Sequence, residues 1–172
     1  GSVSNFVAMM NKEAKKLGAT HTHYVNPDGL QDPDHYTTAK DIYLIAQKVM
    51  ANDFLASVVD TPSYTIPATN VTSAVTVRNT NLLISSSSKY YLSSVKGIKT
   101  GTTTEAGACL VSTAESKGMT YYAVVMGGTE SITNQVVTNS AFADTKALYQ
   151  WVLGNFELRQ LLSTGTPQEQ VS

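Results

Sequence analysis

Apolar residues recur at helical spacing in the first third of the chain. Between residues 3 and 17 they follow one another at three- and four-residue intervals, and a glycine comes next as a helix stop. A second apolar stripe over residues 42–50 follows Thr38, with Asp41 three positions after it as in a capping box. The pattern predicts a first amphipathic helix whose stripe packs in the core, and a second helix that ends near Asn52.

The remaining two thirds alternate between extended and helical patterns. β-Branched residues interrupted by prolines over residues 58–83 predict a short hairpin or an irregular extended crossing. Alternating apolar positions over 108–114 and an apolar run at 121–126 within 119–127, joined by a polar turn at 115–118, predict an antiparallel hairpin with one well-buried strand. A longer helix over about 135–154 is expected to cover one face of that sheet.

Residues 97–102, Gly-Ile-Lys-Thr-Gly-Thr, stand between a serine-rich polar run at 85–94 and the first of these strands. On an extended edge strand, the side chains of Lys99 and Thr100 point to opposite faces, and Gly101 removes the side chain that would block an approaching ligand. Such a strand can dock a peptide and its carboxylate. The lysine supplies a positive charge, the threonine supplies a hydrogen-bond donor, and the backbone amides of the edge can pair with the ligand backbone as another strand would. We expect it to open a meander of three strands.

Composition restricts the range of functions. The chain has 172 residues, of which 42% are hydrophobic, so it is long enough for one globular domain or a large part of one. A net charge of -1 without a basic cluster argues against a nucleic-acid partner. The single Cys109 excludes an internal disulfide, and its apolar strand predicts a buried, inert thiol. No apolar run is long enough to span a bilayer, and the first residues do not form a signal sequence.

Three histidines, His21, His23 and His35, are candidate metal ligands if a carboxylate from residues 28–34 converges on them. The two closest histidines alternate along an extended segment and lack the helical spacing that supports ligation. The interpretation as a metal-binding protein therefore stays open only as a minor alternative, and we expect neither a metal nor a cofactor.

Several spaced segments together resemble one known family. Residues 97–110, Gly-Ile-Lys-Thr-Gly-Thr-Thr-Thr-Glu-Ala-Gly-Ala-Cys-Leu, resemble the third motif of the D-alanyl-D-alanine carboxypeptidases, the low-molecular-weight penicillin-binding proteins. Upstream, segments 22–30, 35–41 and 78–83 are similar to that family's segments in the same order. The resemblance runs over about residues 6–156.

The resemblance implies an α/β (α+β) fold: an antiparallel sheet flanked by helices, as a partial β-lactamase/transpeptidase-like fold. It implies that residues 1–156 are a partial catalytic domain lacking its N-terminal part, and that 157–172 are a linker or the start of a following β-rich domain. It also implies a helical lobe and an apolar face left uncovered, which we expect to cause self-association.

The resemblance also assigns roles to individual residues. Lys99 and the backbone amide of Thr102 are implied to be catalytic, the amide as half of an oxyanion hole. Thr100, Gly101 and Arg78 are implied to bind substrate, and the planar guanidinium of Arg78 suits a substrate carboxylate.

The sequence departs from the family's pattern in two places. Family members use a Ser-x-x-Lys nucleophile on a buried helix and a Ser-x-Asn motif, but no Ser-x-Asn occurs here. The two Ser-x-x-Lys strings, 86–89 and 93–96, fall in the polar connection before the lysine strand, so both missing motifs are expected before residue 1. The family often carries an arginine shortly after the second strand of the hairpin, whereas this chain has Glu130 and no basic residue until Lys146.

The resemblance implies that the parent protein is a serine D-alanyl-D-alanine carboxypeptidase of the cell envelope. Such an enzyme trims peptidoglycan stem peptides that end in D-Ala-D-Ala through an acyl-enzyme, and β-lactams trap it. We expect this chain to be inactive alone. The alternative is a non-catalytic module that binds peptidoglycan peptides or serves as a scaffold.

Overall fold

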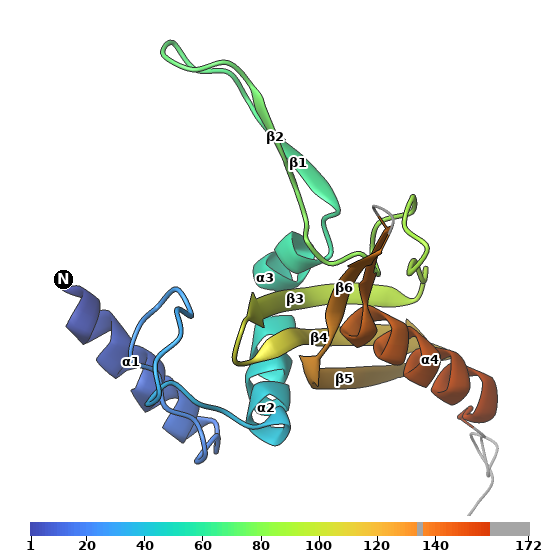
Figure 1. Cartoon of the computed structure of the whole chain (residues 1–172), viewed down its shortest axis with the longest axis horizontal. Coiled ribbons are helices and arrows are strands. Elements are labelled where there is room, and N and C mark those ends of the chain that lie inside the picture. Colours follow the sequence, from blue (N-terminus) through green and yellow to red (C-terminus); the bar gives the residue numbers. More distant parts are fainter. Residues whose placement is uncertain (134–135, 159–172) are drawn as a thin grey trace, which may run out of the picture.

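A computed structural model describes residues 1–133 and 136–158, with a three-stranded antiparallel sheet at its centre (Figure 1). The strands, in spatial order, are β3 (Val95–Thr103), β4 (Gly107–Ser116) and β5 (Met119–Gly128). Helix α4 (Ser140–Asn155) packs on β4 and β5 from one face, and helix α2 (Ala39–Met50) contacts the same strands from the other. The expected meander of three strands is confirmed, with β3 at one edge.

Each N-terminal helix starts at a polar cap. The first is α1 (Val3–Lys16), and the short α3 (Asp53–Val59) follows α2. At each cap, one polar side chain accepts a hydrogen bond from a backbone N–H in the first turn of the helix. The capping residues are Ser2 for α1, Thr38 for α2 and Asn52 for α3. The capping sequence at Thr38 is therefore confirmed, and Asn52, where we expected only a helix end, also begins the next helix.

Two further hairpins flank the sheet. β1 (Ser63–Ile66) pairs with β2 (Val75–Arg78), and this exposed hairpin projects away from the body of the molecule (Figure 1). β6 (Glu130–Thr133) pairs with β7 (Val136–Asn139) directly before α4. The first hairpin confirms one of the two expectations for residues 58–83.

The core lies between α4 and the sheet. Tyr149 is 1% exposed, and its hydroxyl lies 2.9 Å from the Ser112 hydroxyl on β4. Burial raises the pKa of Tyr149 far above its ordinary value, so the group stays a neutral phenol. Leu110 is buried beside it, and the ring of Phe142 stacks on Tyr90 with centroids 5.3 Å apart.

Asp41 ties the segment after α1 to the start of α2. It is 2% exposed, and its Oδ2 atom accepts hydrogen bonds from the His21 N–H at 2.7 Å and from the Thr22 hydroxyl at 2.8 Å. Burial acts to raise the pKa of the Asp41 carboxyl, but the hydrogen bonds from Thr22 and His21 outweigh it and hold the pKa below its usual value. The carboxylate therefore contributes to stability in its charged form.

Three expectations about the elements are wrong. Val3 and Phe6 of the α1 stripe are 65% and 54% exposed, because no other element in the described part of the chain covers that part of the helix. Helix α3 was not expected, since its seven residues are too few for a clear period. The last helix starts at Ser140, because the β-branched run before it forms β7; Gln135, the expected start, lies outside the described residues.

Large apolar side chains are exposed on several elements in the described part of the chain. They lie on α1, α3, the β1–β2 hairpin and α4, and include Phe6 (54%), Phe54 (73%), Val71 (82%) and Trp151 (60%). Within residues 1–133 and 136–158, no one helix meets the length and hydropathy needed to cross a bilayer; α2 and α3 meet them only together, across a 110° bend.

We expect Asp41→Ala to lower the midpoint of thermal unfolding by several degrees near neutral pH, because two donors lose their acceptor. A depressed folded-state pKa adds stability above the unfolded-state value of about 3.9, and that stability is lost as the pH falls through the folded-state value. The difference between wild type and variant, followed by circular dichroism, should therefore shrink as the pH falls below the unfolded-state value.

The control is Asp34→Ala, whose exposed carboxylate lies in the loop that precedes α2. An equal loss of stability in both variants, or a difference that does not depend on pH, would contradict the role given to Asp41.

Candidate functional site

Strand β3 presents two different faces at the edge of the sheet. Among residues 1–133 and 136–158 it pairs with β4 on one side only, with Lys99 opposite Val111 and Thr100 opposite Leu110. Because side chains alternate along a strand, Thr100 shares the face of the buried Leu110, toward α4, and Lys99 lies on the opposite face. The expected division between Lys99 and Thr100 is confirmed.

The segment that leaves β2 fixes the position of this edge. Thr80 places its hydroxyl 2.6 Å from the Thr100 hydroxyl. Asn79 donates from its side-chain amide to the carbonyls of Val59 and Thr61, and its Oδ1 accepts from the backbone of Asn81. Asn79 therefore builds a turn by side-chain-to-backbone hydrogen bonds, and Thr80 is carried against β3.

A pocket of about 230 Å³ lies at this contact. Thr80, Thr100, Gly101 and Thr102 line one side of it, so three hydroxyl-bearing residues and one bare backbone position surround the space. A Cβ atom built on Gly101 meets no atom within 4 Å, so the face of the sheet at this position is open beside the edge strand.

The opposite side of the pocket comes from β6, β7 and the start of α4. Glu130, Asn139, Ala141 and Phe142 line it. Asn139 caps α4 by accepting from the Phe142 N–H at 3.4 Å, and its Nδ2 donates to the Glu130 carboxylate at 3.4 Å. The sequence signal at Glu130 was the absence of an arginine; the hairpin that brings Glu130 beside Thr100 was not visible in the sequence.

Two of the expected site residues lie outside this pocket. Lys99 is exposed, and its ammonium group donates to the Thr100 carbonyl at 2.6 Å. Arg78 is exposed at the end of β2, where it pairs in register with Ser63. Neither is among the described residues that line the pocket, so the structure brings together Thr100, Gly101 and Thr102 but not all five expected residues.

Cys109 is half-buried, not buried as expected. It stands opposite Gly101 in the β3–β4 register, and a glycine has no side chain to cover the neighbouring thiol. The thiol contacts the carbonyls of Ala106 and Gly107, at 3.5 and 3.9 Å.

The histidines are engaged in local contacts. The Nδ1 atom of His23 lies 2.7 Å from the Asp34 carbonyl, and Nδ1 of His35 accepts from the Val25 N–H at 3.4 Å. Within residues 1–133 and 136–158, no three His, Cys, Asp or Glu side chains are placed to hold one metal ion.

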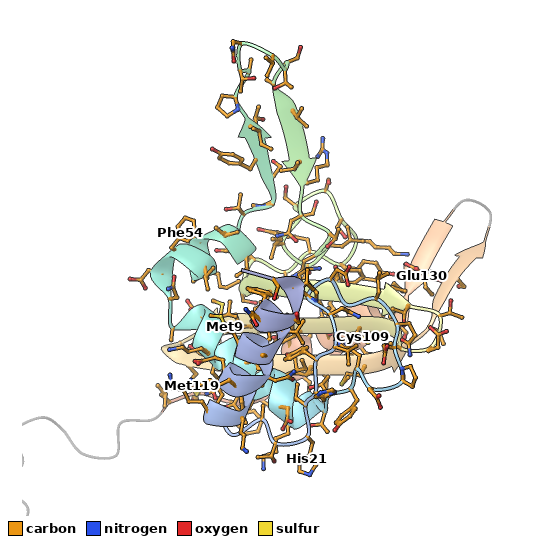
Figure 2. All side chains as sticks on the ribbon, turned by 90° about the vertical axis from the view of Figure 1, so that its left-hand side faces the viewer. Met9, His21, Phe54, Cys109, Met119 and Glu130 are labelled. Carbon is orange, nitrogen blue, oxygen red and sulfur yellow. The ribbon has the colours of Figure 1, made fainter. Side chains whose placement is uncertain are left out.

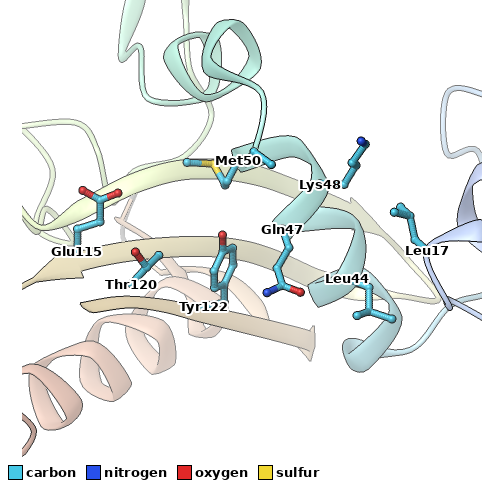
Figure 3. A pocket seen from close by; sticks show the side chains of 9 residues that line it. Leu17, Leu44, Gln47, Lys48, Met50, Glu115, Thr120 and Tyr122 are labelled. Carbon is cyan, nitrogen blue, oxygen red and sulfur yellow. The ribbon is translucent and has the colours of Figure 1, made fainter. Parts of the chain in front are cut away.

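A larger pocket of about 580 Å³ lies between α2 and the opposite face of the sheet (Figure 3). Leu44 and Gln47 of α2 face Thr120 and Tyr122 of β5 across it, with Glu115 at its rim. It contains none of the residues of the 97–102 segment. The smaller pocket is therefore the better candidate, because it combines an open strand edge with convergent polar groups.

Comparisons with known proteins agree with these features. The family profile described as D-alanyl-D-alanine carboxypeptidase matches residues 1–130. The chain is 36% identical over 127 residues to the carboxypeptidase DacF of Bacillus subtilis, covering 74% of this chain and 31% of that relative. It is 32% identical over 169 residues to DacA of Haemophilus influenzae, covering 96% of this chain and 38% of that relative. The chain thus spans about a third of the length of these relatives.

Solved structures confirm the expected fold class. The chain matches the DD-transpeptidase of Streptomyces with a TM-score of 0.71 and 33% identity, over 88% of this chain and 57% of that one. It matches a penicillin-binding protein of Listeria monocytogenes in its cefotaxime-bound form with a TM-score of 0.69 and 28% identity, over 86% and 54% of the two chains.

We expect Gly101→Ala to change the free energy of unfolding by less than about 0.5 kcal/mol, because the added Cβ meets open space. The same methyl group would project from the face of the sheet beside the outer edge of β3, where a docked peptide's side chains would pack, so the affinity for a peptide that extends the sheet should fall about tenfold or more. Chemical denaturation and a titration followed by nuclear magnetic resonance measure the two effects.

Gly107→Ala is the matched control. Gly107 has a φ of +66°, and a Cβ there would lie 2.6 Å from the Gly128 carbonyl, so this variant should lose about 1–3 kcal/mol of stability. If Gly101→Ala binds the peptide as well as wild type does, the outer edge of β3 is not the binding edge.

Proposed function

Because this chain belongs to the D-alanyl-D-alanine carboxypeptidase family, we propose that it carries the substrate-docking edge of a serine carboxypeptidase. The parent enzyme removes the terminal D-alanine of peptidoglycan stem peptides through an acyl-enzyme, and β-lactams trap it. The parent protein then works in the cell envelope, where those peptides occur.

The open edge of β3 at Gly101 is the observation that carries this proposal. A peptide substrate can extend the sheet there, because among the described residues no strand pairs with the outer side of β3, and the space at Gly101 leaves room for a ligand side chain on that face. Hydroxyls of Thr80 and Thr100, 2.6 Å apart, lie next to that path and can hydrogen-bond to the ligand.

We assign separate roles to the residues along this edge. Lys99 attracts the negative charge that develops on the reacting carbonyl oxygen. It also attracts the permanent negative charge of the substrate carboxylate. The Thr102 amide donates to the oxyanion, Thr100 donates to the substrate, and Arg78 contributes long-range attraction from the exposed end of β2.

The nucleophile belongs to a part of the domain that this sequence does not contain. Ser86 and Ser93, the first residues of the two Ser-x-x-Lys strings, are exposed in turns outside any helix. A catalytic serine needs its base held at a fixed distance, and an exposed turn gives no such constraint. We therefore propose that residues 1–156 are a partial catalytic domain; the proposal that 157–172 begin another domain falls almost entirely outside the described residues.

The alternative function, a non-catalytic peptide-binding or scaffolding module, rests on the same edge. The chain has the open strand and its polar pocket but no Ser-x-Asn motif and no helix-borne Ser-x-x-Lys. Binding and chemistry must therefore be measured separately.

Self-association is expected from the exposed surfaces. β5 is the second edge of the sheet, and in the described part of the chain no strand pairs with its outer side. Its sequence contains no charged residue or proline, the usual protection of an edge strand. Light scattering should show dimers or larger species, and a monodisperse monomer would contradict this expectation.

The intact mass of the chain after incubation with excess benzylpenicillin tests the missing nucleophile. We expect no adduct, because an exposed serine lacks an activating base. A fusion that places the preceding part of the Bacillus subtilis relative ahead of this chain should gain one equivalent of penicillin, and Lys99→Ala in that fusion should slow acylation about a hundredfold or more.

The outcomes separate the two functions. An adduct on the unfused chain would place a nucleophile within these residues and overturn the division of the domain. A folded fusion that binds the peptide without acylation would favour the non-catalytic module.

A further inference from the structure

The pocket beside β3 contains a carboxylate and, among the described residues that line it, no basic side chain. Glu130 supplies the negative charge, and the other polar groups are threonine hydroxyls and the amide of Asn139. The chain has no lysine, arginine or histidine between Lys117 and Lys146, so the residues around Glu130 in the sequence add no cation. This charge is the opposite of what a pocket for a substrate carboxylate needs.

Glu130 is held in place by several contacts. Its backbone pairs in register with Asn139, whose Nδ2 donates to the carboxylate. The residues on either side are tied together as well: Ser140 N–H donates to the Thr129 carbonyl at 2.9 Å, and Thr129 N–H donates to the Ser140 hydroxyl at 3.0 Å. The strand that carries the carboxylate is therefore anchored to the first turn of α4, and Figure 2 shows Glu130 on the same side of the view as Cys109.

The start of α4 reduces the charge of the pocket but does not reverse it. Ala141 and Phe142 of the first turn line the pocket, and a helix N-terminus carries about half a positive elementary charge. A full negative charge on Glu130 exceeds that half charge, and Asn139 already uses the Phe142 N–H. Glu130 is the only charged side chain among the described residues that line the pocket.

The cation carried by β3 itself lies on the other face. Lys99 lies opposite Val111, away from Thr100. A ligand that extends the sheet along β3 alternates its own side chains in the same way, so successive groups meet the Lys99 face and the Glu130 face in turn. One ligand can therefore present a carboxylate to Lys99 and an amine to the pocket.

We propose that Glu130 is a specificity-determining residue that selects ligands carrying a free ammonium group. This inference rests on the proposed function and narrows its substrates to stem peptides whose diamino-acid side chain ends in an unmodified amine. The terminal carboxylate binds on the Lys99 side, and the amine enters the pocket near Glu130 and the Thr80–Thr100 hydroxyls.

Two peptides test this inference with the chain as it stands. They are Nα-acetyl-L-lysyl-D-Ala-D-Ala and its L-norleucyl counterpart, which lacks only the ammonium group. We expect the lysyl peptide to bind about two- to fivefold more tightly, the range of a partly exposed ion pair, and added salt to reduce the preference. Titrations followed through the amide signals of Gly101 and Thr102 give both dissociation constants.

Glu130→Gln should abolish the preference while leaving the fold intact. A glutamine keeps an oxygen that can accept from Asn139, so only the charge is lost. The matched control is Glu105→Gln, an exposed carboxylate in the β3–β4 turn that is outside the pocket lining; this variant should keep the preference. The four constants for wild type and Glu130→Gln form a double-mutant cycle that isolates the ammonium–carboxylate coupling.

Each outcome decides a separate point. Equal affinity of wild type for the two peptides, or a preference that survives in Glu130→Gln, overturns the role of Glu130 and leaves the docking edge intact. Binding of neither peptide overturns the docking edge, and the inference with it. A preference lost in Glu130→Gln and kept in Glu105→Gln supports the inference.

Discussion

Tyr149 of α4 reaches the middle of β4, where its hydroxyl and that of Ser112 hydrogen-bond inside the core. Burying two hydroxyls is unfavourable unless they pair, so this contact restricts how α4 lies along the sheet. The position of α4 fixes its first turn, and the first turn fixes Asn139 and the strand that carries Glu130. This side of the candidate site thus depends on the packing of one helix.

The edge of β3 combines two environments that differ in charge. Alternation places Lys99 on one face and Thr100 on the other, and the elements packed on each face complete the difference. On the α4 face, Thr80 arrives from the β2 exit and Glu130 from β6. A docked peptide would therefore contact side chains on both faces of one strand. These contacts discriminate between peptides more strongly than the lysine motif does alone.

The site was predicted in its central strand and missed at its borders. Lys99, Thr100 and Gly101 are consecutive, so sequence order alone places them on one edge. Thr80 and Glu130 reach the pocket from segments about 20 and 30 positions away, and no local pattern records that approach. Arg78, expected beside the substrate, lies exposed on a hairpin outside the pocket lining.

Local pattern determined the elements whose signal lies within the element itself. The cap at Thr38, the periods of α1 and α2, the pattern of β4 and β5 and the motif strand are all visible in the sequence. Tertiary structure decided the rest, namely which apolar stripe is buried, where α4 begins and which side chains share a pocket. Val3 and Phe6 have a correct helical period yet remain exposed, because burial requires a partner surface. A period reports the geometry of one element, whereas a pocket and a core are properties of several elements brought together.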